Sequence, residues 1–307
     1  MRAPIEASAY PSLREQACLY PDGRPAVERR PYLYRAGKVY GLQAHSEQAA
    51  TLDAVAVELD TGNVPLGEAL DGFEAAPLEG RVPVLAVGSN GYPRQLLDKF
   101  SPAAPDDDSV VVLGCTLRDA SIGYCASLSV RNGYVPVTIV HEPGATTHSW
   151  LQWLTPAQLR LIAGTEGARY SLVECGRRAD GSAAVAIHGV SAVPRSVYGW
   201  VFDARLRLAG EAIARFAGNP PHGYVGDPAG VEQEAILQDV VERTLQAQGG
   251  ALTWDGCTLP PTWRTRVRDF LIDQGVANTI PAHWDVVDRG REGFAEALAD
   301  ALRAAAD

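Results

Sequence analysis

Strand-like segments outnumber helix-like ones in the middle of the chain, and this ratio limits the possible folds more than any other feature. Between Val82 and Asp203 about seven short apolar or alternating segments are separated by turn-forming residues, with only two helix-like stretches among them. A doubly wound parallel sheet needs a helix between successive strands, so the pattern argues against that architecture. We predict an α+β fold with a small, curved mixed sheet or barrel and packed helices.

Apolar runs and turn signals give the boundaries of these core segments. Turn-forming residues at 131–133 and 142–144 separate several of the strands. One helix begins at Pro93, and a second covers 155–167, with Thr155 as its N-cap followed by a proline. The strands are expected at 82–87, 110–117, 122–130, 134–140, 148–154, 170–175, 183–190 and 196–203.

The segments on either side of this core differ from it in pattern. Residues 1–30 are rich in Pro, Arg and Glu and predict an irregular arm. Strands are expected at 30–44 and 52–60 and helices at 65–75, 207–218, 230–248, 262–275 and 290–306. We therefore divide the chain into an N-terminal extension (1–80), a core (81–250) and a C-terminal helical appendage (251–307).

Net charge and hydropathy exclude several classes of partner. The 307-residue chain has 27 basic and 37 acidic residues, a net charge of -10, which repels nucleic-acid backbones and anionic membrane surfaces. The first 23 residues lack the apolar stretch of a leader, and no window approaches the roughly 18 apolar residues of a membrane span. We expect a cytoplasmic protein with a small-molecule substrate and neither a nucleic-acid nor a membrane partner. The oligomeric state is not predicted.

Cysteine, lysine and histidine spacing argues against the common cofactor sites. The five cysteines are scattered, odd in number and without a CxxC, so we expect reduced thiols and neither a disulfide framework nor a zinc site. The chain's two lysines, Lys38 and Lys99, do not complete a phosphate-binding loop. His141 and His148 lie seven residues apart but have no third ligand at a suitable spacing. No metal and no organic cofactor are predicted.

One short stretch, "PVLAVGSNGYPRQLLDKF" at 83–100, combines a strand, a glycine-bounded turn and a helix. A turn of this kind directs several N–H groups and the positive end of a helix into one concavity. Such a concavity stabilises a carboxylate or polarises a carbonyl. The turn at 88–90 is therefore the first candidate for a binding site.

The order of motifs after this turn resembles the γ-glutamylcyclotransferase-like superfamily over roughly residues 82–250. The resemblance is carried by "GSN" at 88–90, "VPVTIVHEPG" at 135–144, "SWLQWLTPAQLRLIAGTEG" at 149–167, Tyr170 and "LVE" at 172–174. It implies that Gly88, Ser89 and Asn90 hold the amino-acid end of a substrate, that Glu166 is the catalytic acid/base, and that Tyr170 lies near the pocket. The chain departs from the family at Val87, where the family has a tyrosine, so a hydroxyl is expected to be lost from the pocket rim.

The resemblance implies a cofactor-independent cyclotransferase acting on a γ-glutamyl-type or similar amino-acid amide. A carboxylate facing the turn takes a proton from the substrate amine, the amine attacks its own side-chain carbonyl, and the proton is returned to the leaving nitrogen. Glu166 should then be partly shielded from water. The product of this cyclisation is 5-oxoproline.

Other functions stay open at this stage. The same fold is compatible with hydrolysis of a small amide, or with a catalytically silent module that binds a small carboxylate and contacts a protein through its helices. Ser89 lies in GSNG rather than GxSxG, which disfavours a serine hydrolase, and the spacing of "AVGSNG" does not fit a dinucleotide loop. The three aspartates at 106–108 are expected in a solvated loop.

Overall fold

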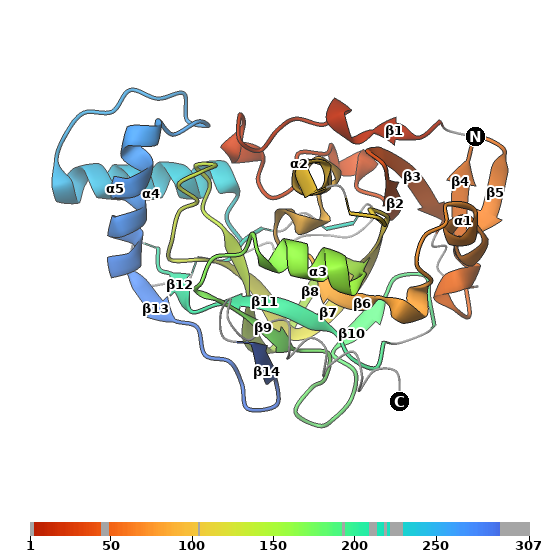
Figure 1. The fold of residues 1–307 in the computed structure, drawn as a ribbon. Coiled ribbons are helices and arrows are strands. Elements are labelled where there is room, and N and C mark those ends of the chain that lie inside the picture. The colour runs from red at the N-terminus through yellow and green to blue at the C-terminus, as the bar shows by residue number, and fades with distance from the viewer. Residues whose placement is uncertain are drawn as a thin grey trace.

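The computed structural model describes residues 3–43, 49–103, 105–191, 194–208, 214–217, 220–221 and 230–288. Its strands are β1 Ile5–Glu6, β2 Tyr32–Arg35, β3 Lys38–Gln43, β4 Ala56–Leu59, β5 Gly62–Pro65, β6 Val82–Leu85, β7 Val110–Tyr124, β8 Val137–Leu154, β9 Tyr170–Glu174, β10 Val185–Ile187, β11 Tyr198–Phe202, β12 Ala204–Leu206, β13 Gly275–Ala277 and β14 Asp285–Asp288. Its α-helices are α1 Leu66–Gly72, α2 Pro93–Ala103, α3 Pro156–Ala163, α4 Gln233–Gln248 and α5 Pro261–Asp273. This part of the chain is a mixed α+β fold, as predicted (Figure 1).

One twelve-stranded sheet organises the molecule, in the order β14-β9-β11-β6-β8-β7-β2-β3-β4-β5. Outside this order, β1 pairs with β3 and β10 pairs with β7. The pairing is antiparallel except between β6 and β11. β5 and β14 stand at the two ends of this order, and the strands in the described ranges do not close into a barrel. The sheet is therefore mixed, as expected, but it is large rather than small and is open.

The long hairpin of β7 and β8 replaces four shorter predicted strands. Arg118 pairs with Thr146 whereas Ala120 pairs with His141, so the segment 142–145 stands opposite Asp119 as a bulge. The Asp119 carboxylate accepts the N–H of Gly144 at 2.8 Å, and Gly144 has a φ of 80°. The turn residues at 142–144 were thus recognised, but they widen a continuous hairpin instead of reversing the chain.

Five of the predicted helices are present, and the starts of two of them follow directly from the sequence. The Thr155 side chain accepts the N–H of Gln158, and the Gln158 side chain accepts the N–H of Thr155, which is a complete capping box. α2 begins at Pro93, as predicted. The expected helices at 65–75, 230–248 and 262–275 appear as α1, α4 and α5.

The helix predicted at 207–218 is wrong for the residues that the structure describes there. The chain enters this region as β12, which pairs with β13, and Arg215 and Phe216 form bridges to Gly123 and Val231. A short apolar pattern of this kind is compatible with strand pairing and with an amphipathic helix. The local sequence therefore does not distinguish a strand from a helix here. The helix predicted at 290–306 lies outside the described residues.

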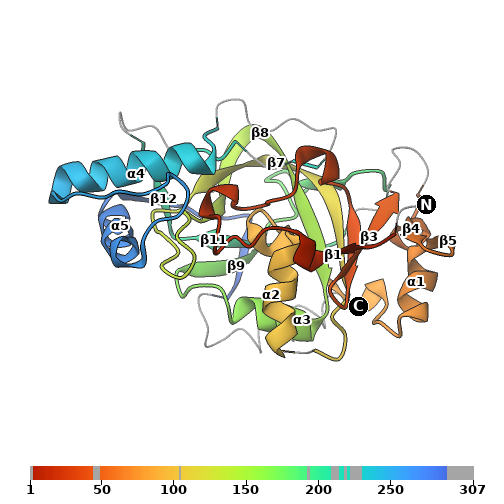
Figure 2. The same cartoon turned by 90° about the horizontal axis from the view of Figure 1, so that it is seen from above.

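The N-terminal segment joins the rest of the molecule in two ways. β2 pairs with β7, so the strands before residue 80 continue the same sheet. The irregular arm before β2 runs across the molecule from β1 toward α4 (Figure 2). It is held by hydrogen bonds from the Tyr92 hydroxyl to the Pro11 carbonyl (2.8 Å) and from Arg94 to the Ser8 carbonyl (3.1 Å).

A disulfide bond joins the arm to the C-terminal helices. Cys18 of the arm is bonded to Cys257, which lies in the connection between α4 and α5. The expectation of five reduced thiols is wrong for this pair, whereas Cys115, Cys125 and Cys175 are free and buried. Stable disulfides are typical of oxidising compartments, so the predicted cytoplasmic location stays a prediction. Within the described ranges, no helix combines the length and the apolar character that crossing a membrane requires.

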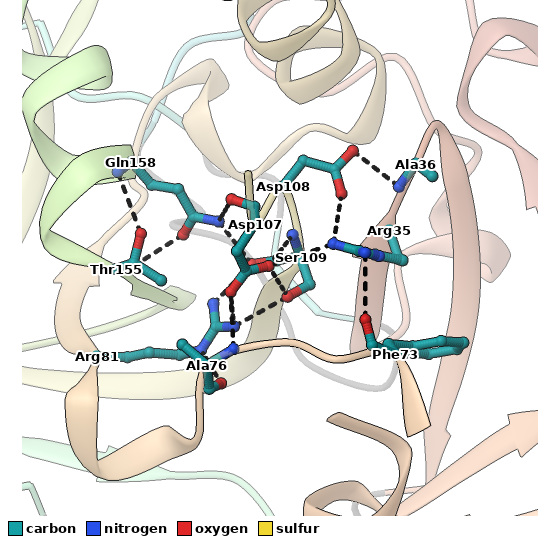
Figure 3. A network of polar contacts seen from close by, with 10 residues as sticks. All are labelled: Arg35, Ala36, Phe73, Ala76, Arg81, Asp107, Asp108, Ser109, Thr155 and Gln158. Carbon is teal, nitrogen blue, oxygen red and sulfur yellow. Dashed lines mark hydrogen bonds and ion pairs between the residues drawn. The ribbon is translucent and has the colours of Figure 1, made fainter. Parts of the chain in front are cut away.

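The loop before β7 is a structural clamp, which corrects the expectation of a solvated turn (Figure 3). Asp107 forms an ion pair with Arg81 (2.7 Å) and accepts the N–H groups of Ala76 (3.0 Å) and Ser109 (2.8 Å). The side-chain amide of Gln158 donates to the carbonyls of Asp107 and Ser109. Asp108 pairs with Arg35, and only Asp106 is exposed as expected. The clamp links the end of α1, the start of β6 and the first turn of α3.

We expect the substitution Asp107→Asn to lower the free energy of unfolding by about 1.5–3 kcal/mol at neutral pH. The substitution weakens hydrogen bonds to a charged group, and it leaves the fully buried Arg81 guanidinium without its ion pair. Burial by itself would raise the pKa of Asp107. The hydrogen bonds from Ser109 and the charge of Arg81 outweigh this effect, so the pKa lies below the ordinary aspartate value. A lowered folded-state pKa stabilises the fold above the unfolded value of about 3.9, and this stabilisation is lost as the pH falls through the folded value.

Urea unfolding at pH 7 and at pH 3 measures this effect. The difference between Asp107→Asn and the unsubstituted protein should shrink at the lower pH. The substitution Asp106→Asn in the exposed neighbour is the matched control and should change stability at neither pH. An equal loss of stability in both variants would contradict the structural role of Asp107 in the clamp.

Candidate functional site

A pocket of about 580 Å³ opens beside the turn that follows β6. Its lining includes all five residues that the sequence predicted for the site, which are Gly88, Ser89, Asn90, Glu166 and Tyr170. Two elements from distant parts of the chain therefore meet here, the 88–90 turn and the segment between α3 and β9. The chemical roles of the five residues stay predictions.

Sheet topology explains why these segments meet. β6 pairs with β8, and α3 follows β8 directly, packs against it and runs back toward the far end of β6. α2 starts just after the turn and lies beside α3 (Figures 1 and 2). Glu166 follows α3 within one turn of chain, and its N–H donates to the Ala163 carbonyl at 3.1 Å. The carboxylate thereby reaches the residues of the turn.

The turn that lines the pocket carries backbone donors without acceptors in the described ranges. Residues 89–91 form a single turn of 3₁₀ helix, and the N–H groups of Gly88, Ser89 and Asn90 donate to no other residue in the described ranges. A Cβ atom on Gly88 would lie 2.8 Å from the Tyr20 hydroxyl, so a larger residue at this position would require the Tyr20 side chain to shift. The predicted property of the turn, several N–H groups directed at one ligand, is compatible with this geometry.

Glu166 and Asn90 are in direct contact. The Asn90 side-chain amide donates to a Glu166 carboxylate oxygen at 3.1 Å. The Glu166 side chain is 17% exposed, so its carboxylate is largely shielded from water, as expected. The acid and the turn therefore reach the same small volume.

Lys99 is a site residue that the sequence analysis missed. From α2 its ammonium donates to the Asn90 side-chain oxygen at 2.7 Å and to the Thr165 hydroxyl at 2.6 Å, and it lies 3.6 Å from the Glu166 carboxylate. Burial lowers the pKa of Lys99, and the nearby Glu166 charge raises it in part. The available signal was its place on the helix directly after the turn. Lys99 positions the Asn90 amide and supplies a positive charge beside Glu166.

Three tyrosines form another wall of the pocket. Tyr20 and Tyr134 are stacked, with ring centroids 3.9 Å apart. The Tyr20 hydroxyl accepts the N–H of Val137 at 3.2 Å, and the Tyr170 hydroxyl donates to the carbonyl of the same residue at 3.4 Å. Burial raises the pKa of all three phenols, so they stay protonated at neutral pH. Val87 also lines the pocket, and the arm contributes the Tyr20 hydroxyl to it.

The two histidines that were considered as a metal pair lie apart. His148 lies beside His188, and both contact the Thr116 hydroxyl. His141 lies beside His283. In the part of the chain that is described, no three His, Cys, Asp or Glu side chains are grouped around a possible ion site.

Comparison of the chain with protein-family models, with curated proteins and with solved structures gave no match. The functional assignment therefore depends on the pocket itself. Its decisive features are a shielded carboxylate, an adjacent ammonium and a turn whose N–H groups have no acceptor among the residues that the structure describes.

Proposed function

We propose that this protein is a cofactor-independent cyclotransferase of the γ-glutamylcyclotransferase-like type, acting on a γ-glutamyl-type or similar amino-acid amide. The observation that carries the proposal is the 3.1 Å contact between Asn90 of the turn and Glu166, inside one pocket. One substrate molecule in this pocket would contact the turn at its amino-acid end and Glu166 at its amine. The order of β6, turn, α2, the β7–β8 hairpin, α3 and Glu166 supports the same assignment for the fold.

The reaction begins with proton transfer to Glu166. The carboxylate takes a proton from the α-amine of the substrate, and the freed electron pair attacks the side-chain carbonyl carbon to close a five-membered ring. The carbonyl oxygen becomes negatively charged in this step and is stabilised by preorganised hydrogen-bond donors at the turn. Because both reacting groups belong to one molecule, no covalent enzyme intermediate is required.

The second half of the reaction returns the proton. Glu166 protonates the leaving nitrogen, the bond between this nitrogen and the former carbonyl carbon breaks, and the carbonyl is restored. The products are 5-oxoproline and a free amine or amino acid. Lys99 and Asn90 keep the carboxylate in one orientation through both transfers.

The substitution Ser89→Ala tests the proposal against its nearest alternative, a serine hydrolase. No histidine is among the described residues that line the pocket, which leaves Ser89 without the most common general base. We expect a panel of γ-glutamyl amines and γ-glutamyl dipeptides to yield 5-oxoproline, measured by mass spectrometry, with both the unsubstituted protein and Ser89→Ala. Turnover by Ser89→Ala should stay within about tenfold of the unsubstituted protein, since the turn loses one side chain but keeps its backbone donors.

Other products would decide against cyclisation. Release of free glutamate in place of 5-oxoproline would indicate hydrolysis, and an acylated Ser89 would indicate a serine nucleophile. Inertness of the unsubstituted protein toward the whole panel would contradict the proposed function and favour a binding module.

A further inference from the structure

The hydroxyl of Tyr20 lies at the turn, although Tyr20 belongs to the N-terminal arm and lies outside the segment of family resemblance. The side chain lines the pocket, and the residue is only 5% exposed. Its hydroxyl lies 2.8 Å from the position that a Cβ on Gly88 would take. The phenol oxygen therefore lies where a side chain at residue 88 would need space.

The Tyr20 hydroxyl accepts a hydrogen bond but donates none among the described residues. A phenol has one proton to donate as well as lone pairs to accept with. The Tyr20 hydroxyl accepts the N–H of Val137, and no acceptor for its own proton is found in the described ranges. Four other tyrosine hydroxyls each donate to a backbone carbonyl, namely those of Tyr32, Tyr92, Tyr124 and Tyr170.

A buried donor without an acceptor is costly, and in native proteins it usually has a partner such as water or a ligand. The 88–90 turn lines the same pocket, and its N–H groups also lack acceptors in the described ranges. Two different segments therefore bring such donors to one pocket, and these segments approach each other at Gly88. A carboxylate is the group that accepts several hydrogen bonds at once.

We infer that Tyr20 is a specificity-determining residue whose hydroxyl donates to the α-carboxylate of the bound amino-acid head group, together with the N–H groups of the turn. This inference rests on the proposed function and names the group that the arm recognises. Stacking on Tyr134 holds the phenol ring in place, and the disulfide of Cys18 anchors the chain two residues before it. The arm is thus part of the binding site rather than an appendage.

Two ligands that differ only in the carboxylate test this inference: 5-oxoproline and 2-pyrrolidinone. Calorimetry should show that Tyr20→Phe weakens binding of 5-oxoproline by about 10- to 100-fold, the range for a hydrogen bond to a charged group. Binding of 2-pyrrolidinone should change less than about twofold, because this ligand has no carboxylate to lose. Tyr10→Phe is the matched control, since Tyr10 is a buried arm tyrosine that packs on Tyr92 outside the pocket, and it should change neither affinity.

The comparison of the two ligands separates recognition from structural support. Equal weakening of both ligands by Tyr20→Phe would show that the hydroxyl only holds Val137 and the pocket wall, and would overturn this inference alone. Unchanged binding of 5-oxoproline would overturn it as well. If the unsubstituted protein binds neither ligand, the proposed function fails and the inference fails with it.

Discussion

The substitution Glu166→Gln is expected to reduce the release of 5-oxoproline by about 10²- to 10⁴-fold, the usual contribution of a general acid/base. The amide has nearly the same shape as the carboxylate, and its oxygen can still accept the hydrogen bond from Asn90. It cannot, however, take a proton from the substrate amine. The loss should therefore appear in kcat, with substrate affinity close to that of the unsubstituted protein.

A matched control for this variant is Glu174→Gln, because Glu174 lies at the end of β9 and is half-buried but does not line the pocket. This variant should keep full activity. Melting temperatures of both variants, measured in parallel, show whether the fold is intact. A Glu166→Gln protein that releases 5-oxoproline at an undiminished rate would remove Glu166 from the reaction.

The double substitution Cys18→Ser, Cys257→Ser should lower the free energy of unfolding by about 2–4 kcal/mol. The disulfide spans 239 residues, and a crosslink over a long loop restricts the unfolded chain strongly. Because Tyr20 is two residues from Cys18, the variant should also bind 5-oxoproline more weakly. Urea unfolding under non-reducing conditions measures the first effect, and calorimetry measures the second.

Reduction provides the control for this experiment. Dithiothreitol should destabilise the unsubstituted protein toward the level of the double variant and should have no effect on the double variant itself. If the oxidised protein and the double variant unfold at the same urea concentration, the crosslink does not support the fold. A double variant that is less stable but binds 5-oxoproline normally would show that the arm keeps its place without the disulfide.

The parts of the fold that the sequence predicted are those controlled by local chemistry. A threonine and a proline determine the start of α3, and a proline determines the start of α2. The glycine turn after β6 is defined by residues next to one another in the chain. Residues 88–90 and Glu166 line one pocket because β6, α2 and α3 occur in the predicted order.

The parts that were missed depend on contacts between distant residues. The pairing of Cys18 with Cys257 is set by where the arm crosses the helices, and no spacing rule encodes it. The turn residues at 142–144 become a bulge only because β7 continues beside them. Asp107 is held in place by Arg81 and Gln158 from other elements. These features follow from the assembled sheet and not from local pattern.

The set of site residues predicted from the sequence was incomplete for the same reason. The sequence analysis considered Lys99 but did not place it in the site. Lys99 lies near Glu166 only because α2 and α3 pack together. Tyr20 comes from an arm with irregular composition, which gives no periodic signal. Residues that approach a site from outside its own motif are visible only in three dimensions.

A crystal structure of the Glu166→Gln variant with a γ-glutamyl amide bound tests the central claim most directly, since the variant should hold the substrate without converting it. We predict one molecule in the pocket, with its carboxylate at the N–H groups of Gly88, Ser89 and Asn90 and its amine within hydrogen-bond distance of the side chain at 166. A ligand that contacts the turn while residue 166 faces away from it, or that binds elsewhere on the protein, would contradict the account.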